Sequence, residues 1–379
     1  MVIVGGGVLG MMHALQARRL RHEVVHLERE ADARGASVRN FGLVWVSGRR
    51  PGGELDLALR ARALWAELAG QIEGLGFRPA GSLTVAAGDA ELRVLQEAAA
   101  LPDAGRRGYE LLDPAGVRAA NPALLGEFAG GMLCRQDAIV EPRQVPRAVR
   151  EHLLAGDGYQ WHPGREAVEV RPHAVRDQSG TWHDGDLVVL CTGAAHGGIA
   201  GVHLAGFPVP PVRRVRLQMM QTLPYGQRLT TSVADGDSLR YYPAYELPGL
   251  ALLGPQPPVA ARTRAQLLLV QRLDGSLTIG DTHEYDEPFA FDVDEDAYEH
   301  LRARAQALLG GPVPPAQRRW AGVYSQVTGD TLYHRSQVAP GVLLVTGPGG
   351  RGMTCAPAIA AETFETETFE TETFEAGSA

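Results

Sequence analysis

The N-terminus reads Met1-Val2-Ile3-Val4-Gly5-Gly6-Gly7-Val8-Leu9-Gly10, an apolar run that passes directly into the spacing Gly5-x-Gly7-x-x-Gly10. A buried strand that turns sharply into a helix needs glycine here, and the first N–H groups of the helix then face a pyrophosphate. Residues 22–28 predict a second strand ending at Glu28, whose carboxylate would accept ribose hydroxyls and repel a 2′-phosphate. This pattern predicts a dinucleotide site that disfavours NADP. The alternative is a chance match in a glycine-rich loop.

Length and composition are typical of a two-domain globular protein. The chain has 379 residues, with 45% hydrophobic and 21% charged. No apolar stretch reaches the ~20 residues of a membrane span, and the N-terminus lacks a basic leader, so we expect a cytoplasmic protein. The net charge of −8 argues against nucleic-acid binding.

Cysteine and lysine usage narrows the chemistry. Cys134, Cys191 and Cys355 lack C-x-x-C or zinc-site spacing, so we expect buried thiols and no metal site. The sequence contains no lysine, so Schiff-base chemistry is excluded and every cationic side chain except histidine is an arginine.

Helix and strand patterns alternate at both ends of the chain, and strands dominate from 208 to 282, including a predicted strand over 238–242. We therefore expect an α/β fold in which a Rossmann-type nucleotide domain is interleaved with a smaller antiparallel-sheet substrate domain. The expected nucleotide domain comprises 1–75, 130–205 and 317–365, and the substrate domain 76–129 and 206–316.

The last residues repeat Thr-Phe-Glu-Thr-Glu, a period of five that fits neither helix nor strand. We expect 366–379 to be a disordered acidic tail beyond a helix that starts near Gly352. A partner-docking motif is the alternative.

Taken together, these segments resemble the D-amino-acid oxidase, glycine oxidase and sarcosine oxidase superfamily of FAD enzymes. The resemblance rests on the N-terminal glycines with Glu28-Arg29, on Gly35-Ala36-Ser37, on 190–194, and on the closing loop 347–353. It implies FAD as cofactor, and the closing helix N-terminus would face the flavin N1 and C2 carbonyl region. The residues expected to bind FAD are Gly5, Gly7, Val8, Leu9, Gly10, Glu28, Arg29, Ala36, Ser37, Asn40, Phe41, Gly42, Thr192, Gly193, Gly349, Gly350, Arg351, Gly352, Met353 and Thr354.

Within the superfamily, the stretches 36–45, 271–285 and 319–324 look like one subgroup, the FAD oxidoreductases associated with phosphonate use. That resemblance implies 2-aminoethylphosphonate or an N-methylated relative as substrate.

The substrate domain departs from the better-known oxidases, which clamp the substrate carboxylate with an arginine of a Trp-x-Gly-x-Arg strand. Here that strand ends in Tyr324, and Arg240 stands near the place where those enzymes offer a tyrosine. An arginine fork suits the oxygens of a phosphonate, whereas the alternative is a surface arginine on a strand edge. The expected substrate-site residues are Arg240, Tyr324, Arg351, Arg49 and Tyr242; each of the arginines could equally be solvated or cap a helix.

Two further departures concern the flavin. No cysteine lies near Val323-Tyr324-Ser325, where sarcosine oxidases attach FAD covalently, so we expect noncovalent FAD. Those enzymes also use a lysine to activate oxygen in the strand that here contains Thr278, which leaves open whether oxygen or another electron acceptor reoxidises the flavin.

The expected reaction is hydride transfer from the carbon bearing an amine to flavin N5, which gives an imine and then a carbonyl compound. One rival hypothesis is oxidation of a carboxylated amine such as glycine, sarcosine or a D-amino acid. Another is a flavin-binding module without turnover.

Overall fold

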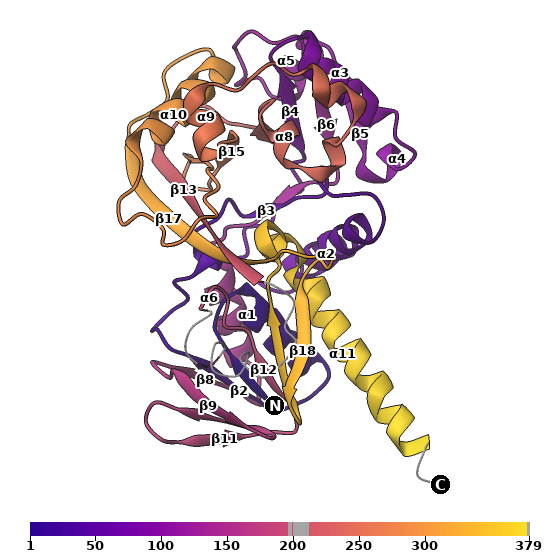
Figure 1. Cartoon of the computed structure of the whole chain (residues 1–379), viewed down its shortest axis with the longest axis vertical. Helices are drawn as coiled ribbons and strands as arrows, with labels where there is room; N and C mark the ends of the chain where they lie inside the picture. The colour runs from indigo at the N-terminus through magenta and orange to yellow at the C-terminus, as the bar shows by residue number, and fades with distance from the viewer. Residues whose placement is uncertain (196–198, 200–211, 377–379) are drawn as a thin grey trace.

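The structure is a computed structural model that describes residues 1–195, 199 and 212–376. It has two halves, each built on one large sheet (Figure 1). The α/β class predicted from the sequence, a parallel sheet plus an antiparallel sheet, is confirmed.

The first half contains a six-stranded sheet in the order β18-β19-β12-β1-β2-β8, parallel except for β18 against β19. Its central strand, β1, is buried on both faces, as its apolar run requires. Its strands are β1 (Val2–Val4), β2 (Val24–Glu28), β8 (Tyr159–Pro163), β12 (Val188–Leu190), β18 (His334–Ala339) and β19 (Val342–Thr346).

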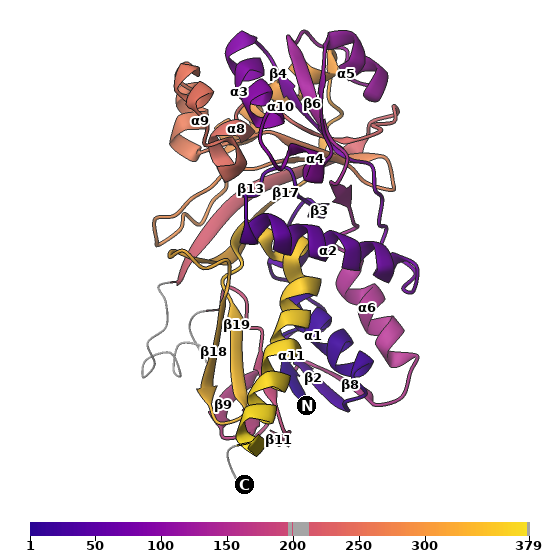
Figure 2. The same cartoon turned by 90° about the vertical axis from the view of Figure 1, so that its right-hand side faces the viewer.

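Helices α1, α2, α6 and α11 accompany this sheet, and α1 packs against α6 and α11 (Figure 2). Their bounds are α1 (Val8–Arg19), α2 (Gly53–Ala69), α6 (Val145–Leu154) and α11 (Gly352–Ala376), with short turns η1 (Ala36–Val38) and η4 (Gly349–Arg351). Two small antiparallel sheets complete this half: β9 (Ala167–Arg171) with β10 (Ala174–Asp177) and β11 (Trp182–Asp184), and β3 (Leu43–Val44) with β7 (Ala138–Ile139).

The second half contains an eight-stranded sheet in the order β17-β13-β16-β15-β14-β4-β6-β5, antiparallel except for β14 beside β4. Its strands are β4 (Ser82–Ala86), β5 (Tyr109–Leu112), β6 (Gly130–Cys134), β13 (Val212–Pro224), β14 (Ser232–Ala234), β15 (Leu268–Gln271), β16 (Ser276–Gly280) and β17 (Ala316–Val327). Its helices are α3 (Asp89–Ala99), α4 (Ala104–Arg107), α5 (Pro114–Ala120), α8 (Ser238–Tyr241), α9 (Pro258–Thr263) and α10 (Glu295–Leu309), with η2 (Pro243–Tyr245) and η3 (Pro248–Leu252).

The sheet memberships correct the expected domain limits. Strand β6 was expected in the nucleotide domain, but it pairs with β4 and β5 in the eight-stranded sheet. Strand β17, also expected there, pairs along its length with β13. Both limits were set by local pattern, which does not reveal which sheet a strand joins. The limit expected at 205/206 lies outside the described residues.

One local prediction is also wrong. The predicted strand over 238–242 is the short helix α8, which begins in a turn where the Ser238 hydroxyl donates to the Asp235 carbonyl at 2.6 Å. Helix α11 runs to Ala376 and so reaches into the segment 366–379 that was expected to be a disordered acidic tail. Residues 377–379 of the expected tail lie outside the described part of the chain. None of the helices among the described residues combines the length and apolarity that crossing a membrane requires.

Trp65 of α2 ties that helix to the start of α11. Its side chain is completely buried, and its indole N–H lies 3.1 Å from the carbonyl oxygens of both Met353 and Thr354. Since the end of α11 that contains Met353 and Thr354 also lines the large cavity described below, this contact positions part of the site.

We expect Trp65→Ala to destabilise the protein by about 3–5 kcal/mol, because it leaves a large cavity and frees two carbonyls. Trp65→Phe, which keeps most of the ring, should cost much less. Thermal unfolding of both variants checks this, and equal melting temperatures for Trp65→Ala and the wild type would contradict it.

Candidate active site

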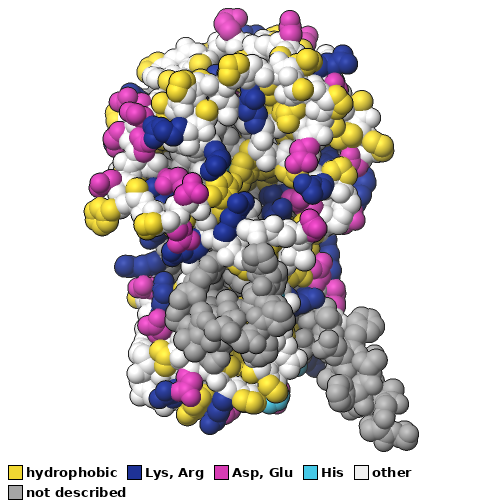
Figure 3. All heavy atoms as spheres, viewed as in Figure 1, with side chains coloured by type: hydrophobic (Ala, Val, Ile, Leu, Met, Phe, Trp, Pro, Cys, Tyr) yellow, Lys and Arg dark blue, Asp and Glu magenta, His cyan; other side chains and the backbone are white. Residues whose placement is uncertain are grey.

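One large cavity, of about 1580 Å³, is lined by residues of both halves. Drug-sized ligands fill roughly 300–1,000 Å³, so this space suits a dinucleotide with a small second ligand. Figure 3 shows arginine side chains around a hollow with hydrophobic atoms at its floor.

The N-terminal glycines have two roles: some line the cavity, and one lets α1 pack closely on the preceding turn. Gly5, Gly7, Val8 and Leu9 line the cavity. Gly10 does not: a Cβ there would lie 1.9 Å from the Gly5 carbonyl oxygen, so Gly10 lets α1 pack on the turn. Gly5 has φ +103°, a conformation that favours glycine, and a Cβ on it would lie 2.3 Å from the Cys191 carbonyl oxygen.

Glu28 lies at the end of β2 with its carboxylate fixed by backbone. One oxygen accepts the Gly6 N–H at 2.6 Å and the other accepts the Glu30 N–H at 2.9 Å. A carboxylate can accept about four hydrogen bonds, so acceptor capacity remains for ribose hydroxyls. Arg29 also lines the cavity and is exposed.

The segment after β2 folds back over α1. The Ser37 hydroxyl accepts the Val8 N–H at 2.8 Å, and Ala36, Asn40 and Phe41 line the cavity with it. The Asn40 amide donates to the Ala36 and Ser37 carbonyls and accepts the Gly42 N–H, so it shapes this turn. Gly42 is outside the lining; a Cβ there would lie 2.1 Å from the Val140 carbonyl oxygen.

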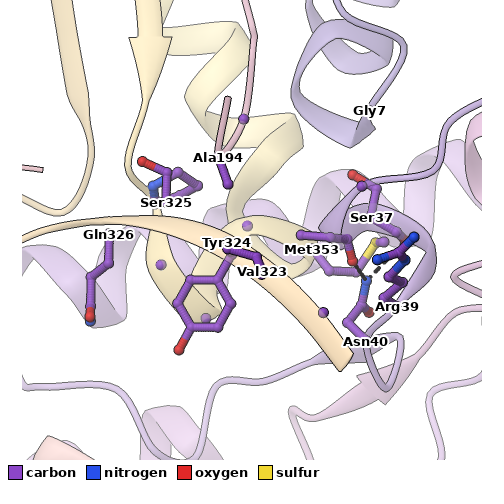
Figure 4. A pocket seen from close by; sticks show the side chains of 18 of the residues that line it. Gly7, Ser37, Arg39, Asn40, Ala194, Val323, Tyr324, Ser325, Gln326 and Met353 are labelled. Carbon is purple, nitrogen blue, oxygen red and sulfur yellow. Dashed lines mark hydrogen bonds between the residues drawn. The ribbon is translucent and has the colours of Figure 1, made fainter. Parts of the chain in front are cut away.

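Two later segments complete this end of the cavity. Thr192 and Gly193 follow β12, and the Thr346 hydroxyl donates to the Gly193 carbonyl at 3.2 Å. The closing loop supplies the start of α11, where Gly349 has φ +61°. The expected residues Gly349, Gly350, Arg351, Gly352, Met353 and Thr354 all line the cavity. In Figure 4, Gly7, Ser37 and Asn40 lie to one side and Tyr324 of β17 lies across from them.

Arg49 and Arg351 share one carboxylate. Arg351 donates to Glu54 at 2.7 Å, and Arg49 lies 3.6 Å from the same oxygen. Burial by itself raises the pKa of Glu54, but the two guanidiniums outweigh it and hold that pKa below its ordinary value. The cluster therefore carries one surplus positive charge beside the N-terminus of α11.

The Arg49 segment is fixed by a buried carboxylate. Asp137 accepts the Val46 and Ser47 N–H groups and the hydroxyls of Ser47 and Ser82, all at 2.5–3.0 Å. Arg49 also donates to the Trp45 carbonyl at 2.9 Å. These bonds fix the backbone between Trp45 and Arg49, two residues that line the cavity.

Tyr241, Tyr242 and Tyr324 are three of the four tyrosines that line the part of the cavity formed by the second half. The Tyr241 and Tyr324 hydroxyls are 3.4 Å apart, and the Tyr241 ring stacks on His283 with centroids 4.1 Å apart. Tyr242 packs on Trp45 at 5.5 Å. Burial raises the pKa of all three phenols, so they are neutral. Sequence reasoning missed Tyr241, although its position beside Arg240 was a signal.

Arg240 lies in the short helix α8 and not on the strand expected over 238–242. Its guanidinium donates to the Gly254 carbonyl at 2.5 Å and lies 3.8 Å from Asp237. It nevertheless lines the cavity, with 30% of its side chain exposed. Thr278, at the position where relatives have lysine, is buried in β16 and is not among the lining residues.

Sequence reasoning also missed two arginines, which stack on Tyr285 in the cavity wall. The guanidinium carbons of Arg213 and Arg264 lie 4.1 and 4.7 Å from the Tyr285 ring centroid. Both arginines are exposed, and neither forms a salt bridge with a described carboxylate. Nothing in the sequence pattern marks them, because only folding brings them to one ring.

The comparisons with known proteins agree with this geometry. The family described as FAD dependent oxidoreductase (DAO) matches residues 1–366. The chain belongs to this family. It is an FAD-dependent oxidoreductase.

Solved structures of this family share the fold. Glycine oxidase from Geobacillus kaustophilus has 20% identity and a TM-score of 0.75, with 95% of this chain and 92% of that chain covered. L-proline dehydrogenase from P. horikoshii has 17% identity and a TM-score of 0.75, with 95% and 90% covered. Iminodiacetate oxidase from Chelativorans sp. BNC1 has 16% identity and a TM-score of 0.74, with 95% and 93% covered. A comparison with curated protein sequences finds no match.

The residues of the cavity fit FAD. A Cβ added at Gly7 would have one protein atom within 4 Å, the Ser37 hydroxyl oxygen at 3.0 Å. The space beside the Gly7 backbone is therefore open to a phosphate. The Trp45 indole N–H is buried and has no acceptor among the described residues, and the flavin ring carries acceptors. No group of three or more His, Cys, Asp or Glu side chains in the described chain is placed to hold a metal ion.

We expect Gly7→Val to weaken FAD binding at least tenfold while lowering the melting temperature of the apoprotein only slightly, because the new side chain occupies phosphate space and its Cβ meets a single protein atom, the Ser37 hydroxyl oxygen. Gly10→Val should lower both the FAD affinity and the melting temperature, since its Cβ collides with the backbone carbonyl of Gly5. Glu28→Arg should also weaken FAD binding. Fluorescence titration of the apoproteins with FAD measures this.

Gly105→Ala is a matched control, since a Cβ there meets nothing within 4 Å. Native FAD affinity in Gly7→Val would contradict the assignment of the pyrophosphate site.

Proposed function

We propose that this enzyme oxidises a small amine that carries a phosphonate group, such as 2-aminoethylphosphonate or its N-methyl derivative. FAD, held noncovalently by the residues described above, supplies a two-electron acceptor for the hydride on the carbon bearing the amine. The protein's own residues hold the substrate, orient that carbon, and neutralise the acid.

The observation that carries this proposal is that three exposed arginines of the second half, Arg213, Arg240 and Arg264, line the cavity. A phosphonate offers three oxygens and up to two negative charges, so it can engage more than one guanidinium fork. A carboxylate has two oxygens, and a single guanidinium fork can pair with both of them. The better-known oxidases would use a strand arginine at the position of Tyr324, which cannot serve as an anion clamp while neutral.

We assign the acid to Arg240 and Arg264. Arg49 and Arg351, the second donors expected from the sequence, already share Glu54. Their one surplus charge, next to the N-terminus of α11, is better placed to stabilise negative charge on the reduced flavin.

The competing function is oxidation of a carboxylated amine. It is supported by the names of the structural relatives, which include a glycine oxidase and an iminodiacetate oxidase. Their identities of 16–20% leave the substrate open.

The decisive experiment mixes the yellow protein anaerobically with a panel of amines and follows flavin absorbance. We expect bleaching with 2-aminoethylphosphonate or its N-methyl form, and much slower bleaching with glycine, sarcosine, D-alanine, L-proline and iminodiacetate. Faster bleaching with the carboxylated amines would overturn the phosphonate assignment.

We expect Arg240→Met and Arg264→Met each to raise KM for the aminophosphonate about tenfold to a hundredfold, since a charge-assisted pair contributes roughly 1.5–3 kcal/mol. Bound FAD should be retained. Steady-state kinetics with Arg302→Met as control, an exposed arginine of α10 outside the cavity, measures the effect. Unchanged KM in both variants would remove these arginines from the site.

A further inference from the structure

Two buried oxygen acceptors lie together in the cavity wall. Asp281 follows β16 and Gln266 precedes β15, and the two residues are 5% and 2% exposed. The Gln266 N–H donates to the Asp281 carbonyl at 3.0 Å, and the Gln266 amide donates to Asp281 Oδ1 at 3.2 Å. The two side chains therefore form one unit.

This unit has fewer donors than its oxygens require. Gln266 Oε1 is buried and has no hydrogen-bond partner among the described residues. His283 Nε2 lies 3.7 Å from Asp281 Oδ2, which is beyond hydrogen-bond range. A buried acceptor without a donor, and above all a buried carboxylate without a cation, is costly. The missing partner is therefore a ligand that carries N–H donors and a positive charge.

An ammonium group has both properties, and the proposed substrate is an amine. We propose that Asp281 and Gln266 form the amine subsite, in which Gln266 Oε1 accepts one N–H and Asp281 Oδ2 takes one proton from the substrate ammonium. An N–H bond breaks and an O–H bond forms on Asp281. The nitrogen then holds a free electron pair, which forms the C=N bond as the hydride leaves the carbon for FAD.

The surroundings of Asp281 suit a group that takes up a proton. Burial raises its pKa above the ordinary value, with His283 opposing this. No described arginine lies within 4 Å to hold it permanently ionised. The titratable groups that face it from the neighbouring elements are His283, Tyr241, Tyr242, Tyr285 and Tyr324.

This inference rests on the proposed function for the identity of the ligand, an amine, and for its probes, an amine substrate and an analogue without the amine. The test compares Asp281→Asn with the wild type, using 2-aminoethylphosphonate as substrate and ethylphosphonate as competitive inhibitor. Asp330→Asn, the same change at an exposed position outside the cavity, is the control.

We expect Asp281→Asn to lower kcat/KM for the aminophosphonate about a hundredfold at neutral pH, in the range of a lost general base. The inhibition constant of ethylphosphonate and the FAD content should change less than about twofold. The deficit should also shrink as the pH approaches the pKa of the substrate amine, because free amine needs no base. Gln266→Met should raise KM for the amine without weakening the binding of ethylphosphonate.

Three results would overturn the proposal: kcat/KM of Asp281→Asn within about threefold of the wild type, equal losses for substrate and ethylphosphonate, or a deficit independent of pH. If Asp281→Asn does not fold, unchanged KM in Gln266→Met overturns it. If wild-type protein is bleached by sarcosine and not by the aminophosphonate, the proposed substrate fails, and sarcosine with acetate becomes the pair that tests the amine subsite.

Discussion

The cavity depends on one buried carboxylate. Asp137 is inaccessible to solvent and accepts hydrogen bonds from Val46, Ser47 and Ser82, which belong to the segment after β3 and to β4 of the eight-stranded sheet. Burial raises its pKa, while these donors favour the ionised form. Loss of any one donor would leave a buried carboxylate oxygen with one hydrogen bond instead of two, so these donors hold the two halves of the protein in one arrangement at this point.

A second buried charge strengthens the same segment. Arg107 is fully buried, and it donates to the carbonyls of Val46 and Ser47 while pairing with Asp103 at 2.6 Å. The segment between Trp45 and Arg49 thus has its N–H groups held from one side and its carbonyls from the other. Its position is set by side chains from distant parts of the chain, and this gives the cavity a rigid wall without a regular element.

The charges of the cavity are separated in a way that suits its chemistry. Arginines with exposed side chains line it, a cluster with one surplus positive charge lies beside the α11 N-terminus, and the acceptors Asp281 and Gln266 are buried in the wall. A small zwitterion with an acid at one end and an amine at the other matches this distribution. Neutral tyrosines contribute apolar surface that excludes water, which strengthens every electrostatic interaction inside.

The sequence by itself determined the dinucleotide end of the site, because short-range sterics act there: Gly5 and Gly10 sit where backbone atoms leave no room for a Cβ, and Glu28 follows its strand at a fixed distance. Tertiary structure decided the substrate end. Asp281, Gln266, Arg264 and Trp45 come together only when β15, β16 and the segment after β3 pack, and no local pattern encodes such long-range contacts. The same limit explains why Arg240 was expected on a strand and why β6 and β17 were assigned to the wrong sheet, since a strand's partner is chosen by packing and not by its own residues.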